Sequence, residues 1–146
     1  MCFIRPAQKS DLERIAEIEV FNYRLNFYPI FRNDAFYFSE LRTSALAAAY
    51  AKEPFGLYVY DDGVVKGFVQ VVRQEIRKLF VEPVLQSNSI GAALLRFATE
   101  QLHADHLWAL EKNMRAIAFY ERHGFHLTAD KKPEEGTHEY LVRLMR

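Results

Sequence analysis

The sequence predicts one α/β domain over residues 1–146, with its elements in the order β-α-α-β-β-β-α-β-α-β-β. Three observations support this prediction. The hydrophobic pattern changes along the chain between helical spacing and the short β-rich runs that are typical of strands. Glycines, prolines and an Asp-Gly pair separate these runs. The 146 residues are 50% hydrophobic, enough for one buried core, and they contain no repeat, low-complexity segment or linker.

The N-terminal third is expected to hold one short strand and two helices. A β-rich run at residues 2–5, stopped by Pro6, predicts the strand. Helical spacing predicts a helix over 11–25, and a second, alanine-rich helix over 39–53 ends near Pro54. The expected buried residues of the first helix are Leu12, Ile15, Ile18 and either Phe21 or Asn22.

A hairpin and a third strand follow, and then a helix. Two β-rich runs within 56–72 flank Asp62-Gly63, a pair that supplies the positive φ angles of a tight turn. The third run, 75–84, is ended by Pro83, and helical spacing resumes over 90–105. The expected buried residues are Ile76, Leu79, Val81, Ile90, Leu94, Leu95, Phe97, Ala98 and Leu102.

The sequence pattern of the C-terminal part predicts a strand, a helix and a final pair of strands. Residues 106–110 form a short apolar run, and the helix over 113–125 is closed by Gly124, a usual residue after the last helical turn. The strands 125–129 and 137–145 are expected to be joined by a charged loop.

Composition narrows the function classes. Lys plus Arg and Asp plus Glu both number 19, and this balance argues against a general nucleic-acid binder, which normally carries a basic excess. The single cysteine, Cys2, excludes an internal disulfide and fits a reducing compartment. No apolar run approaches the ~18 residues of a membrane span, and the N-terminus lacks the apolar core of a signal peptide. We therefore expect a cytoplasmic protein with no nucleic-acid or membrane partner.

The segment QSNSIG (86–91) joins a strand to a helix. The first amides of a helix lack partners within it, and the helix dipole adds partial positive charge there. Small residues at Ser87, Ser89 and Gly91 leave room for a bulky anion such as a phosphate. The spacing does not match the phosphate loop that ends in Gly-Lys-Ser/Thr. Taken alone, the segment fits a phosphate site or an ordinary capped loop.

A second segment, NMRAIAFYERHGF (113–125), follows the strand at 106–110. Together with VEPVLQSNSIGA (81–92), it resembles the GNAT family of acyl-CoA-dependent N-acetyltransferases. The order of elements matches as well, so the resemblance covers nearly the whole chain. It implies a mixed, mostly antiparallel central sheet flanked by helices. Ser89 departs from the pattern, because the family usually has its first loop glycine there. A helical or bridging backbone is expected at this serine.

The resemblance implies acetyl-CoA (CoA) as the co-substrate and no metal; His103, His106, His123 and His126 also lack metal-ligand spacing. By analogy, the Val81 amide polarises the thioester carbonyl, the Asn113 side chain binds the pantetheine arm, and Arg115 and Arg122 are candidates for the 3′-phosphate. The implied cofactor-binding residues are Leu79, Phe80, Val81, Gln86, Ser87, Asn88, Ser89, Ile90, Gly91, Ala92, Asn113, Ala116 and Phe119.

The implied reaction is direct transfer of an acetyl group, in a ternary complex, to a primary amine of a small molecule or a protein. Tyr120 would protonate the coenzyme thiolate; the alternative is an aromatic residue of the helix face that packs in the core. Glu75 is either the base that deprotonates the amine through water or a solvated glutamate at a strand end, and Glu111 and His138 are weaker candidates. The alternative is a catalytically silent CoA-binding, regulatory or interaction domain on the same fold.

Residues 21–38 contain eight aromatic residues in eighteen. In the family this region forms one wall of the acceptor site, and ring faces attract ammonium groups. Tyr23, Tyr28, Phe31 and Tyr37 are therefore candidate substrate-binding residues. Alternatively, these rings pack the helices onto the sheet or cover the face of a homodimer.

Overall fold

A seven-stranded sheet, of order β1-β2-β3-β4-β5-β7-β6, forms the centre of the molecule. The structure is a computed structural model that describes residues 2–86 and 89–146. The strands are β1 (Ile4–Pro6), β2 (Leu57–Asp61), β3 (Val65–Val72), β4 (Glu75–Val81), β5 (His106–Leu110), β6 (His126–Pro133) and β7 (Tyr140–Met145). Neighbouring strands are antiparallel except for the parallel pair β4–β5. The predicted mixed, mostly antiparallel sheet is confirmed.

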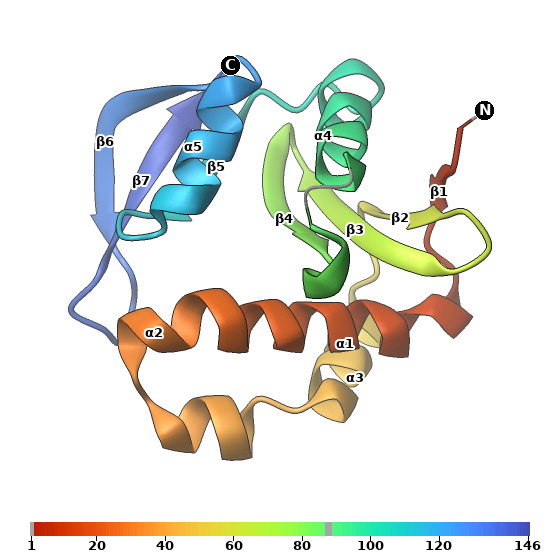
Figure 1. Ribbon diagram of the computed structural model, residues 1–146, viewed down its shortest axis with the longest axis horizontal. Helices are drawn as coiled ribbons and strands as arrows, with labels where there is room; N and C mark the ends of the chain where they lie inside the picture. The colour runs from red at the N-terminus through yellow and green to blue at the C-terminus, as the bar shows by residue number, and fades with distance from the viewer. Residues whose placement is uncertain (1, 87–88) are drawn as a thin grey trace.

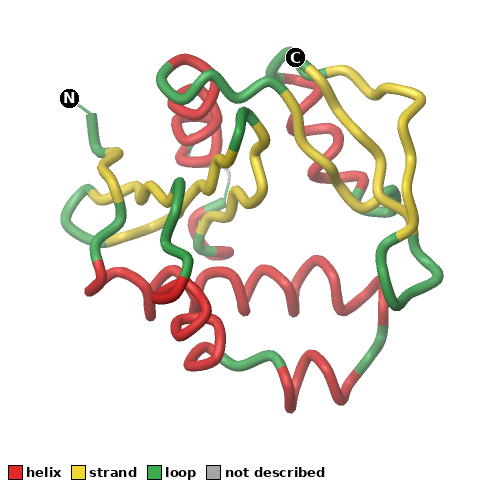
Figure 2. The backbone as a smooth tube through the Cα atoms, turned by 180° about the vertical axis from the view of Figure 1, so that it is seen from behind, coloured by secondary structure: helices red, strands yellow, loops and turns green. Residues whose placement is uncertain are grey.

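Helices cover both faces of this sheet. They are α1 (Leu12–Asn22), α2 (Tyr28–Phe31), α3 (Thr43–Lys52), α4 (Ile90–Glu100) and α5 (Met114–Arg122). A π-helical turn, η2 (Tyr23–Phe27), joins α1 to α2, and a second, η3 (Phe36–Glu40), precedes α3. Figure 1 shows α1 and α2 as one long rod below the strands, with α4 and α5 above it. The same rod spans both halves of the sheet when seen from behind (Figure 2).

Each face of the sheet has its own core. Leu94 of α4, Ile117 of α5 and Phe125 pack on one face, and Ile15 and Phe68 pack under α1 and α3 on the other. Burying each such side chain contributes roughly 1.5–3 kcal/mol. Because both faces are covered, the sheet forms a rigid frame for whatever lies along its strand ends. No helix in the described ranges is both long enough and apolar enough to span a bilayer.

The first helix ends earlier than predicted. Helix α1 stops at Asn22, and the chain continues as a π-helical turn because Pro29, in the first turn of α2, cannot donate the hydrogen bond that a continuous α-helix needs. Of the two alternatives for the last inward position, Asn22 is buried and Phe21 is exposed. The second helix, predicted over 39–53, begins later, at Thr43.

The charged loop predicted over 130–136 is mostly strand. Strand β6 continues to Pro133, with Lys131 and Lys132 paired to β7 after a bulge. Lys132 lies over the ring of Trp108, with its Nζ 4.2 Å from the ring centre. Lysines are common on edge strands, where they discourage pairing with another chain. The composition of this segment therefore indicated a loop where the chain forms an edge strand.

Strands β4 and β5 pair only at their beginnings. Their ladder consists of Glu75 with His106 and Ile76 with Leu107. Beyond these pairs the two strands continue to Val81 and Leu110 without bonding to each other. The sheet is therefore open along the second half of β4.

Candidate active site

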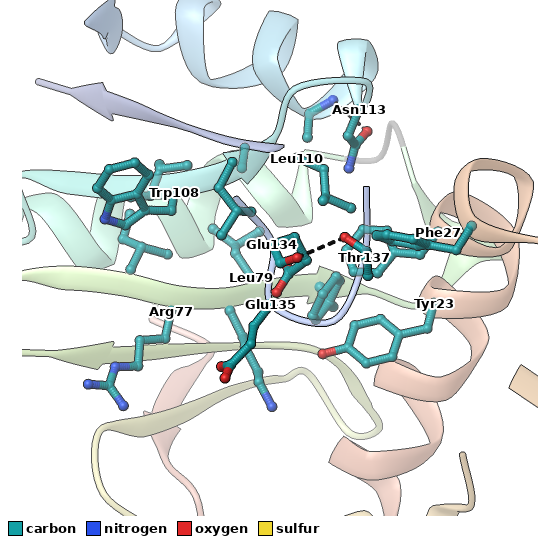
Figure 3. Close-up of a pocket in the computed structure, with 18 of the residues that line it drawn as sticks. Tyr23, Phe27, Arg77, Leu79, Trp108, Leu110, Asn113, Glu134, Glu135 and Thr137 are labelled. Carbon is teal, nitrogen blue, oxygen red and sulfur yellow. Dashed lines mark hydrogen bonds between the residues drawn. The ribbon is translucent and has the colours of Figure 1, made fainter. Parts of the chain in front are cut away.

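Two cavities formed by described residues meet where β4 and β5 separate. The larger has a volume of about 760 Å³ and the smaller about 500 Å³. Both are lined by the same five residues, Leu79, Phe80, Asn113, Ala116 and Tyr120. One elongated site therefore runs past the open edge of β4, and Figure 3 shows the larger cavity.

The backbone of β4 presents hydrogen-bonding groups to this gap. The Phe80 carbonyl faces β3, since a Cβ added at Gly67 would lie 3.0 Å from its oxygen. In a trans peptide the N–H points the opposite way, so the Val81 amide faces away from β3. Antiparallel alternation places the backbone groups of Leu79 on that same side. A bound chain with carbonyl and amide groups can pair here as an additional strand.

The loop at 86–91 lies along the smaller cavity. Gln86, Ser89, Gly91 and Ala92 all line it. Ile90 does not, because its side chain is buried in the core. Two predicted residues, Ser87 and Asn88, lie outside the described residues.

The backbone prediction for Ser89 is wrong. This residue has φ +66° and ψ +6°, a left-handed conformation rather than a helical or bridging one. A side chain with a Cβ is strained in that region, and glycine is not. The loop therefore requires the turn that a glycine would provide. At Gly91, an added Cβ would lie in ordinary van der Waals contact with the Phe119 ring, at 3.5 Å.

Helix α5 places its N-terminal and central residues in the gap. The Asn113 side-chain oxygen accepts a hydrogen bond from the Ala116 amide at 3.3 Å and caps the helix. This bond leaves the side-chain NH₂ of Asn113 available to the cavity. Ala116 and Phe119 line the smaller cavity as predicted. The short side chain of Ala116 keeps the gap open in front of Tyr120.

Tyr120 is 8% exposed and contacts both cavities. Its ring packs edge-on against Phe119 and Phe125. Burial raises the pKa of its hydroxyl above the ordinary value of 10.0. The phenol is protonated at neutral pH even without this shift, and the shift makes it a weaker acid.

The aromatic wall of the larger cavity is only partly the one predicted. Tyr23, Phe31 and Tyr37 line it, but Tyr28 does not. The hydroxyl of Tyr28 donates instead to Asp34, which turns it away from the cavity. The sequence interpretation missed Phe27 and Phe36, which line the cavity, although both lie in the aromatic segment.

The opposite wall comes from the β6–β7 loop, which the sequence interpretation did not include. Glu134, Glu135 and Thr137 line the larger cavity across from Tyr23 and Phe27 (Figure 3). The Thr137 hydroxyl donates to the Glu134 carbonyl at 2.9 Å and closes the loop on itself. Within residues 2–86 and 89–146, neither glutamate forms an ion pair. No sequence signal near 134–137 connects this loop to the aromatic segment.

The three candidates for the base differ in where they lie. Glu75 lines the larger cavity at the start of β4, 3.8 Å from the Nε of Arg77. At ~3.3 Å per residue, it lies about 20 Å along the strand from Val81. Glu111 is paired with Lys131 at 2.8 Å, and His138 is exposed.

A buried carboxylate, Glu19 of α1, lies close to Tyr23 and Lys78, which line the larger cavity. It is fully buried, accepts from the Lys78 ammonium at 2.8 Å and is also bonded to the Tyr50 hydroxyl. Lys78 donates to the Tyr50 oxygen as well, at 2.8 Å. Burial and the charge of Glu19 raise the pKa of Tyr23. Lys78 lines the larger cavity, so its charge there is already compensated by Glu19.

Two arginines give the smaller cavity positive charge at the α5 side. Arg115 and Arg122 line it together with His123. Anions are favoured beside such side chains and beside the amides at the start of α4. Among the described residues, no group of three or more His, Cys, Asp or Glu side chains is arranged to hold a metal ion.

Comparison with known proteins agrees with this geometry. The family model for the acetyltransferase (GNAT) domain matches residues 53–127. The chain is 32% identical over 68 residues to the peptidyl-lysine N-acetyltransferase YiaC of Escherichia coli K12. That match spans 46% of this chain and 47% of the relative, about half of its length.

Solved structures share the fold over almost the whole chain. The solution structure of apo YjaB from Escherichia coli has a TM-score of 0.75 at 19% identity, covering 97% of this chain and 95% of that one. The PaiA N-acetyltransferase of Thermoplasma acidophilum, solved in complex with coenzyme A, has a TM-score of 0.67 at 16% identity, covering 98% of both chains.

Proposed function

Because the chain belongs to the GNAT acetyltransferase family, we propose that it transfers an acetyl group from acetyl-CoA directly to a primary amine, with both substrates bound together. The observation that carries this proposal is the meeting of the two cavities at the open edge of β4. One substrate enters from each side, and the same five residues contact both cavities. A direct transfer needs such a shared point, and it needs no covalent enzyme intermediate.

The residues of the smaller cavity fit coenzyme A. The amides at the start of α4 and the side chains of Arg115 and Arg122 suit its phosphates, and the backbone groups of Leu79 with the N–H of Val81 suit its amide-containing arm. Acetyl-CoA supplies the acetyl group as a thioester. The Val81 N–H is the candidate donor to a carbonyl oxygen in the gap.

Tyr120 is the proposed proton donor. The hydroxyl is protonated at neutral pH, and a phenol at the junction of the two cavities can give its proton to a departing thiolate. Glu75 is not proposed as the base, because it lies about 20 Å along the strand from Val81, beyond the reach of one bridging water. The proton of the amine is instead lost to solvent in the larger cavity.

The residues of the larger cavity favour binding of a cationic acceptor. Its aromatic wall includes Tyr23 and Phe27, and its opposite wall carries Glu134 and Glu135 without ion-pair partners among the described residues. Ring faces and carboxylates both favour an ammonium group. A lysine side chain, the acceptor in the name of the similar Escherichia coli enzyme, is one amine of this kind.

The test begins with thermal unfolding in the presence of acetyl-CoA, CoA or ATP. A ligand at 100 times its Kd stabilises the folded state by about 2.7 kcal/mol. We expect acetyl-CoA and CoA to raise Tm and ATP to leave it unchanged. Release of free CoA thiol is then measured with a panel of amines and lysine peptides. Absence of a shift with every ligand would contradict the proposal.

A catalytically silent CoA-binding domain is the second candidate, and the strained backbone of Ser89 is the observation that favours it. This alternative predicts a thermal shift with CoA but no thiol release with any amine. The two measurements together therefore separate an enzyme from a binding domain.

A further inference from the structure

Asn22, the last residue of α1, is a buried amide that contacts the cofactor side of the site. It is 2% exposed. Its Nδ2 donates to the carbonyls of Ile18 and Val81, both at 2.9 Å. Its Oδ1 accepts from the side-chain amides of Gln86 at 3.0 Å and Asn26 at 3.4 Å. Both donors and both acceptor positions of this carboxamide are thus occupied.

The bond to Val81 fixes one peptide unit of β4. The carbonyl of Val81 is held by Asn22, and the following N–H, that of Glu82, donates to the Lys66 carbonyl at 2.9 Å. With both ends bonded, this peptide plane cannot rotate. The amide of Val81 lies on the same side of the strand as its carbonyl, so its direction into the gap is set as well.

The bond to Gln86 fixes the first residue of the loop at 86–91. The Gln86 side chain turns back to α1 and donates to Asn22, with a weaker contact of 3.5 Å to the Val81 carbonyl. Asn22 therefore links the end of β4 to the first residue of the loop. The π-helical turn η2 begins at the next residue, and it carries Tyr23 and Phe27 into the larger cavity.

We propose that Asn22 is a positioning residue, which holds the Val81 peptide and the Gln86 side chain in the arrangement that binds coenzyme A. This inference rests on the proposed function and assigns no contact between Asn22 and a substrate. Asn22 holds Val81 directly and Gln86 through the bond between their side chains, so removing either side chain breaks that shared bond. The effects of the two removals on CoA binding are then not additive.

The test is a double-mutant cycle on CoA affinity, measured by isothermal titration calorimetry. Asn22→Ala and Gln86→Ala are each expected to raise the Kd for CoA about 10-fold. The Kd of the double variant is expected to equal the larger of the two single-variant Kd values. It is not expected to rise by the product of their two fold-changes. A product, or an unchanged Kd in either single variant, overturns the inference.

Gln70→Ala is the matched control. Gln70 is also a buried amide, 9% exposed, and it donates to the Phe55 carbonyl at 3.1 Å. It lies outside both cavities, so its removal is expected to lower stability and leave the Kd for CoA unchanged. A weakened affinity in this control would show that lost stability alone explains the result, and it would overturn the inference.

The double-mutant cycle also tests the inference separately from the proposed function. If the wild-type protein binds no CoA, both the proposed function and the role of Asn22 are wrong. If it binds CoA and the effects of the two substitutions on Kd are additive, only the role of Asn22 is wrong. Should Asn22→Ala not fold, Gln86→Met, which keeps the length of the side chain and removes its donor, is expected to raise the Kd about 10-fold. An unchanged Kd in that variant contradicts the link.

Discussion

At the scale of single residues, Ser89 shows how one backbone angle bears on cofactor binding. Its left-handed φ of +66° costs roughly 1–2 kcal/mol for a residue with a Cβ. The turn is retained because the helix that follows, α4, is anchored in the core by Ile90 and Leu94. The core therefore maintains a strained turn at the edge of the smaller cavity.

Replacing Ser89 with glycine is expected to relieve this strain. Because glycine also gains freedom in the unfolded chain, the net stabilisation is at most about 1 kcal/mol. We expect a higher midpoint in urea and a lower Kd for CoA. His103→Gly, at another positive φ of +58° but outside both cavities, is the control. It should stabilise the protein without changing the Kd, and an equal change in Kd would contradict a local effect.

Tyr120 gives a second prediction at this scale. Tyr120→Phe keeps the ring that packs against Phe119 and Phe125 and removes the proton donor. We expect kcat to fall roughly 100-fold or more with little change in Tm or in CoA affinity. Tyr58→Phe, a tyrosine of β2 outside both cavities, should leave kcat unchanged. Full activity in Tyr120→Phe would exclude its role as the acid.

At the scale of elements, an ionic cluster joins the first strand to the hairpin. Arg5 of β1 donates to Asp11, before α1, at 2.7 Å and to Asp61 of β2 at 3.0 Å. The Arg5 guanidinium lowers the pKa of Asp11 below its ordinary value of 3.8, and the Gln8 amide adds to this effect. The cluster thereby fixes where α1 begins, and so where Asn22 lies at its other end.

This depressed pKa predicts an acid-sensitive contribution to stability. The folded state holds the Asp11 proton less tightly than the unfolded chain does. The contribution is therefore present above pH 3.8 and is lost as the pH falls through the lowered pKa. Free energies of unfolding from urea titrations at pH 7 and below pH 4 test this. Asp11→Asn and Arg5→Gln should both flatten the dependence, and a slope like that of the wild type would contradict it.

The elements differed in how well the sequence predicted them. The hairpin around Gly63, the end of β4 before Pro83 and the end of α5 before Gly124 were predicted well, because each depends on a local backbone preference. In the hairpin, Gly63 has a positive φ and Asp62 does not. The π-helical turn after Asn22 and the length of β6 were not predicted. Pro29 indicates a break in the helix, but whether the chain leaves the helix there or continues through a π-helical turn depends on packing, and an edge strand depends on its partner β7.

At the scale of the whole molecule, the larger cavity is assembled from distant parts of the chain. The aromatic segment within 23–37 and the loop within 134–137 form its opposite walls. Burial raises the pKa of Tyr37, and the charge of Glu134 adds to that shift, which agrees with two walls that face each other closely. The proposed acceptor site is therefore formed only by the complete fold.

Neutralising the loop carboxylates tests that property. Glu134→Gln with Glu135→Gln is expected to raise KM for an amine roughly 10-fold and to leave the Kd for CoA unchanged, because both residues lie in the larger cavity alone. Glu100→Gln, at the end of α4, serves as the control. An unchanged KM in the double variant would argue that the aromatic wall alone binds the acceptor.

By itself, the sequence determined the fold class and the order of the main elements, which follow from local periodicity. Its motifs, through a family resemblance, also named Gly91, Asn113 and Tyr120, which line the smaller cavity. The tertiary structure decided the left-handed turn at Ser89, the exclusion of Tyr28 and the facing of the β6–β7 loop toward the aromatic segment. It also decided that Asn22 bonds to Val81. These features depend on contacts between residues far apart in the chain, which packing selects and local sequence does not encode.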